Sequence, residues 1–329
     1  MPEVPVLVLF GPTASGKTAL LEKLFPSGKK PSAEIVSADS MQVYRGMDIG
    51  TAKPPPEIRA VLPHHLIDIL DPREQYSAGE FIRLAADCCN SIHGRGLLPV
   101  ISGGAGFYLK SFIQGMPEAP PSNAAVRKKL SAELNERGGA TLRSELQSID
   151  PRSAARIHPN DVYRLLRALE ILRITGQPPS SFAVRAQGRP SKYRFLLIGL
   201  EWERETLYRR INERCALMFK AGLAEEAQGL FAQNYTPCDP GMKAIGYKEF
   251  FIDNYDGTYG FSNDIAGVED LVARHSRWYA KRQITWFKNT PGVTWIKLDG
   301  EGADDDRAIK AAAVAIQEKT RAFLENCGL

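Results

Sequence analysis

Short apolar runs alternate with segments of helical period along the first hundred residues. Residues 4–10 are apolar throughout, and shorter runs occur within residues 35–40 and 97–101. Between the last two, residues 76–93 carry apolar side chains three and four positions apart, which is the period of one helix face. Buried strands that alternate with amphipathic helices predict a parallel sheet covered by helices.

The pattern changes after Gly115, where prolines interrupt it and arginine-rich helical segments follow. Helices are expected there over residues 126–135, 141–147 and 161–175. A strand over 194–200 then returns to the sheet, followed by helices over 204–233 and 265–289, a strand over 293–297 and a terminal helix. The sequence therefore predicts a core of residues 1–115 and 194–329 that carries an inserted helical subdomain, residues 116–193.

A glycine-rich loop joins the first apolar run to the next helix. Gly11 and Gly16 let the backbone turn so that successive N–H groups point inward, Lys17 adds a positive charge, and the Thr18 hydroxyl suits Mg²⁺. The helix N-terminus that follows also favours anions. We therefore predict an α/β fold similar to P-loop NTPases. The polyphosphate site comprises Gly11, Pro12, Thr13, Ala14, Ser15, Gly16, Lys17 and Thr18.

Two further side chains are candidates for the same site. Asp39 ends the second predicted strand, and ligands of open α/β sheets bind at that edge. Its carboxylate could hold Mg²⁺, lie beside an acceptor group, or cap a helix. Arg210 and Arg214 share one helical face that can present a guanidinium to phosphate; the alternative is pairing with Glu213 or Glu205 on a solvated surface.

Composition excludes some classes of protein. The chain has 42 Lys and Arg against 38 Asp and Glu, and a net charge of +4 is too small to indicate a nucleic-acid partner without local clusters. The five cysteines lack metal-ligand spacing, which fits reduced thiols in a cytoplasmic protein and no zinc site or disulfide framework. Neither a leader peptide nor an apolar run of membrane-spanning length is apparent, and a monomer is expected.

An ordered set of motifs resembles bacterial-type tRNA dimethylallyltransferases, also called tRNA isopentenyltransferases. The resemblance covers most of the chain. Its motifs are Gly11-Pro-Thr-Ala-Ser-Gly-Lys-Thr18, Asp39-Ser-Met-Gln42, Gly46-Met-Asp-Ile-Gly-Thr-Ala-Lys-Pro54, Pro63-His-His-Leu-Ile-Asp68, Tyr76-Ser-Ala78, Arg156-Ile-His-Pro-Asn-Asp161, Arg164-Leu-Leu-Arg-Ala-Leu-Glu170, Ala244-Ile-Gly-Tyr247 and Lys281-Arg-Gln-Ile-Thr-Trp286.

The resemblance implies transfer of a dimethylallyl group from dimethylallyl pyrophosphate to N6 of an adenine, at position 37 of tRNAs that read codons starting with U. It makes Asp39 the general base, because the amine of adenine is a poor nucleophile. Lys17, Arg214 and the loop amides would meet the departing pyrophosphate, with Mg²⁺ attached at Thr18. ATP hydrolysis would not be required.

The resemblance also implies contacts with the anticodon stem–loop. The expected contact residues are Asp39, Ser40, Met41, Gln42, Ala105, Arg127, Tyr163, Arg164, Leu165, Leu166, Arg167, Lys243, Ala244, Ile245, Gly246, Tyr247, Lys248, Lys281, Arg282, Gln283 and Lys288. Ser40 and Gln42 would read an extruded base, or would instead satisfy backbone groups of their own turn. The cations around residues 278–288 would contact RNA, and most of the aromatic residues there would pack in the core.

One position departs from the family pattern. Ala105 stands where the family usually has threonine, so a hydroxyl that could relay a proton is missing, and we expect a lower rate or a different relay. Two other classes stay open: a small-molecule kinase or a prenyltransferase that uses AMP, and a non-catalytic RNA-binding module. For His64 and His65, hydrogen bonds within a loop are expected rather than catalysis.

Overall fold

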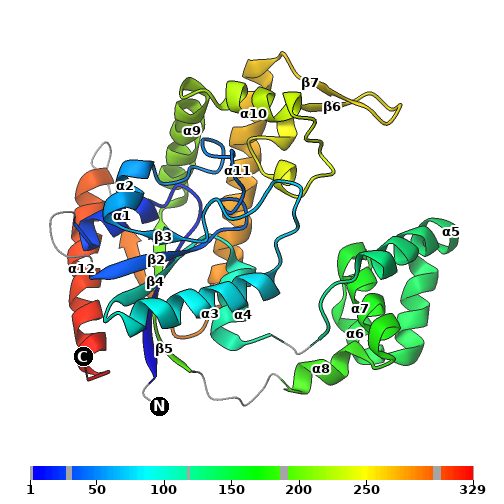
Figure 1. The fold of residues 1–329 in the computed structure, drawn as a ribbon, viewed down its shortest axis with the longest axis horizontal. Coiled ribbons are helices and arrows are strands. Elements are labelled where there is room, and N and C mark those ends of the chain that lie inside the picture. The colour runs from blue at the N-terminus through cyan, green and yellow to red at the C-terminus, as the bar shows by residue number, and fades with distance from the viewer. Residues whose placement is uncertain (1–2, 27–31, 117–118, 186–191, 299–304, 329) are drawn as a thin grey trace. The chain divides into compact units, whose positions relative to one another are not determined.

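The chain forms two compact units, shown in Figure 1. The computed structural model describes residues 3–26, 32–116, 119–185, 192–298 and 305–328. One unit comprises residues 1–113 and 191–329, and the other comprises residues 114–190. Each unit has an apolar core of its own.

The larger unit is built on a parallel sheet with the strand order β3-β2-β4-β1-β5-β8. The strands are β1 (Val4–Phe10), β2 (Ala33–Ala38), β3 (His64–His65), β4 (Leu98–Gly103), β5 (Tyr193–Trp202) and β8 (Thr294–Leu298). Each pairing between neighbours is parallel. All seven residues of β1 are buried, as expected for a central strand with helices on both faces. The predicted α/β fold is confirmed.

Helices surround this sheet (Figure 1). They are α1 (Lys17–Leu24), α2 (Pro56–Val61), α3 (Ala78–Gly94), α4 (Gly106–Gln114), α9 (Arg204–Lys220), α10 (Leu223–Ala232), α11 (Ile265–Phe287) and α12 (Asp305–Glu325). A capping box of Ser77 and Glu80 starts α3. The single helix expected over residues 204–233 is wrong, because Gly222 adopts a left-handed φ of 100° and separates α9 from α10.

Several short elements were not predicted. Besides β3, they include the hairpin of β6 (Phe251–Asp253) and β7 (Tyr259–Phe261) and two 3₁₀ turns at Gly241–Lys243 and Lys248–Phe250. Two or three residues are too few to show a hydrophobic period.

The smaller unit is helical. It contains α5 (Ala124–Ile149), α6 (Pro151–Arg156), α7 (Val162–Thr175) and α8 (Pro179–Arg185). The long α5 is interrupted by a non-helical Gly138, so it corresponds to the two helices expected over 126–135 and 141–147. Leu142, Leu146 and Leu169 are fully buried between these helices.

A close backbone approach fixes the edge of the sheet near the glycine-rich loop. A Cβ on Gly103 would lie 2.1 Å from the carbonyl oxygen of Ala38, a backbone atom of a paired strand that cannot move aside. We expect Gly103→Ala to lower the free energy of unfolding by about 3 kcal/mol or more, measured by urea denaturation. Gly94→Ala is the control, since its Cβ would meet nothing within 4 Å. Equal denaturation midpoints for the two variants would contradict this prediction.

Candidate active site

The glycine-rich loop lies at the carboxyl edge of the sheet, between β1 and α1. Gly16 has a φ of 88° and directly precedes the first residue of α1, so the turn requires glycine. Residues 13–19 of the loop and helix line a cavity of about 500 Å³, and Asp39, Arg214 and Gln283 line it as well. Six of the eight predicted phosphate-binding residues, Thr13 to Thr18, therefore line an open space of the size that a small ligand needs, whereas Gly11 and Pro12 do not line it.

Lys17 lies inside this loop with its ammonium group turned onto backbone carbonyls. Nζ donates to the carbonyl oxygens of Gly11 (3.0 Å) and Pro12 (2.9 Å). The pKa of Lys17 is lowered to about 7, first by burial and then by the neighbouring Arg214 charge, while the Asp39 carboxylate acts in the opposite direction. The loop thus holds a lysine that an arriving anion would help to protonate.

This pKa predicts a pH dependence for anion binding. Above pH 7, Lys17 of the free protein is mostly neutral, whereas a bound anion favours its charged form. Binding therefore takes up a proton. As the pH rises above 7, the affinity falls by up to about tenfold per pH unit. We expect this for inorganic pyrophosphate, measured at pH 8 by calorimetry in buffers of different ionisation enthalpy. Lys17→Met controls for protons taken up by pyrophosphate itself. Equal proton uptake by both proteins would contradict the prediction.

Asp39 immediately follows β2 and lines two cavities. Its Oδ1 accepts hydrogen bonds from the backbone N–H groups of Met41 (2.8 Å) and Gln42 (3.3 Å). The helix-capping role considered from the sequence is wrong, because Asp39 closes a turn and no helix follows it. The turn uses only one of the two carboxylate oxygens. The same turn orients the carboxylate toward the cavities.

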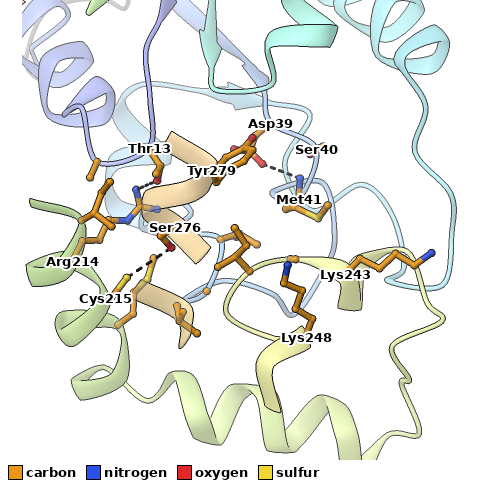
Figure 2. Close-up of a pocket in the computed structure, with 18 of the residues that line it drawn as sticks. Thr13, Asp39, Ser40, Met41, Arg214, Cys215, Lys243, Lys248, Ser276 and Tyr279 are labelled. Carbon is orange, nitrogen blue, oxygen red and sulfur yellow. Dashed lines mark hydrogen bonds between the residues drawn. The ribbon is translucent and has the colours of Figure 1, made fainter. Parts of the chain in front are cut away.

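The second cavity, of about 250 Å³, is shown in Figure 2. Part of its wall is apolar and comes from α9 and α11, through Ile211, Met218 and Val272. Cationic residues line it as well, namely Lys243, Lys248, Arg282 and Arg214. The two cavities share six lining residues, Thr13, Ala14, Asp39, Thr51, Arg214 and Tyr279. Asp39 therefore lies where the cavity of the glycine-rich loop meets a partly apolar one.

The two arginines of α9 have different environments. Arg214 donates to the Thr13 hydroxyl (2.9 Å) and lines both cavities, and burial lowers its pKa. Arg210 instead donates from Nε to the carbonyl oxygen of Ala14 (2.9 Å), forms an ion pair with Asp305 and lies over the ring of Trp202. Arg214 thus lines both cavities, while Arg210 lines only the larger one and holds a backbone carbonyl of the loop.

Gln283 of α11 joins the loop to β4. Its Oε1 accepts from the backbone N–H of Thr13 (2.8 Å), and its Nε2 donates to the carbonyl oxygen of Gly104 (2.8 Å). The side chain is buried. Although the resemblance placed Gln283 among the tRNA contacts, its amide group is engaged within the protein here. Tyr279, one turn earlier, lines both cavities, and burial together with the Asp39 charge raises its pKa.

Gln42 is engaged in a similar way. Its Nε2 donates to the carbonyl oxygens of Thr51 and Ala52, both at 3.2 Å, and its Oε1 accepts from the Ser37 hydroxyl. Sequence reasoning left open whether Gln42 satisfies backbone groups of its own turn; in this structure it satisfies backbone groups nine and ten residues later in the chain. Ser40, by contrast, lines the smaller cavity.

Glu226 was not found by sequence reasoning. Its carboxylate accepts hydrogen bonds from the backbone N–H groups of Asp48, Ile49 and Gly50 and from the Tyr247 hydroxyl (2.6 Å). Tyr247 is almost fully buried, so its ring does not face solvent. Its hydroxyl instead contacts Gly50 and Glu226, and these contacts hold the segment of residues 48–50. No motif around Glu226 signalled the role, because its three backbone partners lie about 177 residues earlier in the chain.

In the smaller unit, the expected tRNA contacts divide into exposed and buried groups. Arg164 and Tyr163 are exposed, and Arg127 lies over the Tyr163 ring at 4.7 Å. Arg127 and Arg167 both pair with the buried carboxylate of Glu170. Leu165 and Leu166 pack in the core, so their side chains do not face solvent.

The remaining candidates have simple placements. Ala105 packs against the core and donates its N–H to the carbonyl oxygen of Ala38. His64 contacts the Leu62 carbonyl oxygen and His65 contacts Glu34. Lys281 and Lys288 are exposed on α11 and at its end. Within the described ranges, no helix has the length and apolarity that a bilayer crossing requires.

Comparison with known proteins agrees with this geometry. The family model described as IPP transferase matches residues 42–290. The tRNA dimethylallyltransferase of Geobacter sulfurreducens is 42% identical, covering 89% of this chain and 91% of that protein. The crystal structure of tRNA isopentenylpyrophosphate transferase from Bacillus halodurans is 38% identical with a TM-score of 0.66, covering 99% and 98%.

A more distant structure, of a eukaryotic dimethylallyltransferase acting on tRNA, is 27% identical with a TM-score of 0.78 and covers 98% of this chain and 80% of that one. The family model matches about three quarters of the chain, and several relatives cover nearly all of it. The chain belongs to the IPP transferase family.

Proposed function

We propose that this protein is a tRNA dimethylallyltransferase. It transfers the dimethylallyl group of dimethylallyl pyrophosphate to N6 of adenine 37 in tRNAs that read codons starting with U. The products are N6-(dimethylallyl)adenosine and pyrophosphate. The observation that carries the proposal is the position of Asp39, where the cavity of the glycine-rich loop meets a partly apolar cavity with cationic residues in its wall.

The leaving group is bound by the loop. When the bond between C1 of the prenyl group and the pyrophosphate oxygen breaks, negative charge grows on that oxygen. Loop N–H groups, Lys17 and Arg214 face this charge as donors that are already in place before the bond breaks. The Thr13 N–H is excluded from this set, because Gln283 already accepts its hydrogen bond.

The acceptor reacts on the other side of Asp39. A new bond forms between N6 of adenine and C1, and the amine then has one proton in excess. Asp39 accepts that proton, which keeps N6 nucleophilic as the bond forms. The apolar wall of Ile211, Met218 and Val272 suits the prenyl tail, since burial of methyl groups is favourable.

Mg²⁺ is part of the proposal. Thr18 lines the same cavity as Asp39, and hydroxyl, phosphate and water oxygens are the ligands that Mg²⁺ takes in phosphate sites. Within the described ranges, no cluster of three or more His, Cys, Asp or Glu is arranged to hold a metal. Phosphate oxygens of the donor would therefore complete the ligands of the ion beside Thr18, and the ion would neutralise part of their negative charge.

The RNA is recognised through separate groups of cations. Lys243, Lys248 and Arg282 line the smaller cavity, into which the target adenine must be extruded from its stack. In the smaller unit, Arg164 and the Arg127–Tyr163 pair offer an exposed guanidinium and an exposed ring to the anticodon stem–loop. The protein is expected to act in the cytoplasm as a monomer.

The test is incubation of the full chain with labelled dimethylallyl pyrophosphate, Mg²⁺ and either unmodified tRNA or AMP. The proposal expects label in tRNA, at the adenine identified by mass spectrometry of nuclease digests. A tRNA with guanosine at position 37 is the control and should take up none. Label in AMP alone would indicate a small-molecule enzyme, and label in neither would indicate a binding module; both results would refute the proposal.

A further inference from the structure

Trp278 lies on an exposed face of α11 that is rich in cations. It is 53% exposed, so it is not one of the aromatic residues of this segment that pack in the core, as was predicted for most of them. Exposed neighbours on the same helix include Arg274, Lys281 and Arg282. The segment from Arg274 to Lys288 contains no Asp or Glu. The positive charges would attract a polyanion, and the exposed ring offers a surface on which flat aromatic groups of that polyanion can stack.

The ring is held in place by its neighbours. The Arg274 guanidinium lies 5.4 Å from the Trp278 ring centroid, and the His275 ring lies 5.3 Å from it. His275 is itself fixed, because its Nδ1 lies 2.7 Å from Oε1 of the buried Glu249. An aromatic side chain with few rotamers to lose is a favourable contact surface.

The ring is also close to the predicted adenine cavity in the fold. Its chain neighbour Tyr279 and Arg282, one turn further on, line that cavity. Lys248 also lines the cavity. Its Nζ lies 3.8 Å from Oε1 of Glu249, the carboxylate that contacts His275. Trp278 therefore belongs to the outer surface beside the cavity, where unpaired bases next to an extruded adenine would lie.

We propose that Trp278 is a stacking platform for an unpaired base of the anticodon loop other than the target adenine. The inference rests on the proposed function and extends it to a further contact residue. Stacking needs only the face of a base, so Trp278 raises affinity for an open loop and reads sequence weakly.

The experiment measures affinity of the full chain for a fluorescently labelled anticodon stem–loop, with Trp278→Ala, Trp278→Phe and a control. We expect Trp278→Ala to weaken binding by about 5- to 100-fold and Trp278→Phe to restore most of it. The control is Tyr255→Ala, which removes another exposed aromatic side chain, 95% exposed, from the tip of the β6–β7 hairpin beside Asp253 and Asp256. It should bind like the wild type.

A series of stem–loops with one abasic nucleotide at each unpaired position identifies the partner. Removal of the stacked base should weaken the wild type but not Trp278→Ala, while the other positions should affect both proteins equally. Wild-type affinity of Trp278→Ala, or a loss that no single base accounts for, would overturn the inference. So would a change in sedimentation of Trp278→Ala without a change in RNA affinity, which would indicate contact between copies of the chain.

These outcomes are separate from failure of the proposed function. If the wild type binds and modifies tRNA while Trp278→Ala behaves identically, only the stacking inference falls. If the wild type binds the stem–loop through Trp278 but transfers no label, the proposed function falls and the stacking inference stands.

Discussion

Asp39→Asn is expected to lower the rate of dimethylallyl transfer at saturating substrates by about 10²- to 10⁴-fold, the usual contribution of a general base. Asparagine keeps an Oδ1 that can accept from the N–H groups of Met41 and Gln42, so the turn after β2 should persist. It cannot take up the proton from N6. The measurement is single-turnover incorporation of labelled prenyl group into tRNA, together with thermal unfolding of each protein.

The matched control is Asp39→Ala, which removes both the base and the turn's hydrogen bonds. If Asp39 is the base, the asparagine and alanine variants are equally inactive, and only the alanine variant has a lowered Tm. If the carboxylate serves mainly to close its turn, the asparagine variant retains nearly full activity while the alanine variant does not. That second result would remove Asp39 from the reaction and leave the proposed mechanism without a base.

Local sequence patterns predict the part of the site that is made by neighbouring residues. The apolar run of β1, the glycines of the loop and the acidic residue after β2 each have a short-range signature, and the parallel sheet brings their ends to one edge. The same reasoning predicted one helix over residues 204–233, because the helical period continues through Gly222. A single left-handed glycine ends that helix, and periodicity alone does not detect it.

The supporting side chains could not be predicted from local patterns. Gln283 binds a backbone group 270 positions earlier in the chain, and Glu226 binds loop amides from a different helix. Their roles depend on backbone N–H and carbonyl groups, which every residue has, so no residue pattern marks the partner. The resemblance assigned Gln283 to tRNA because of its neighbours in the motif, whereas its amide connects the loop to β4.

The two arginines of α9 allow loop support to be separated from contact with the leaving group. We expect Arg214→Gln to lower the rate of transfer by about 10²- to 10³-fold, the typical effect of removing one preorganised donor. Its Tm should change little, because the lost hydrogen bond is offset by removal of a buried charge. Burial disfavours that charge, as the lowered pKa of Arg214 indicates. Rates are measured as above, and unfolding is followed by calorimetry.

Arg210→Gln, one helical turn away, is the matched comparison. It loses the hydrogen bond to the Ala14 carbonyl oxygen, the ion pair with Asp305 and the contact with the Trp202 ring. We therefore expect its free energy of unfolding to be lower by about 1–3 kcal/mol. Asp305 keeps a second partner in Arg209 (3.0 Å), which limits the loss. Transfer should slow much less than in Arg214→Gln.

The two variants are expected to lose different properties, Arg214→Gln mainly the rate of transfer and Arg210→Gln mainly stability. Arg214 lies where the two cavities meet and acts on charge that exists only as the prenyl–oxygen bond breaks, so its removal appears in the rate. A guanidinium that holds a loop carbonyl acts in the free protein, so its removal appears in stability. Equal losses of rate from both variants would mean that the whole arginine face contacts the pyrophosphate, and the assignment of Arg214 alone would be wrong.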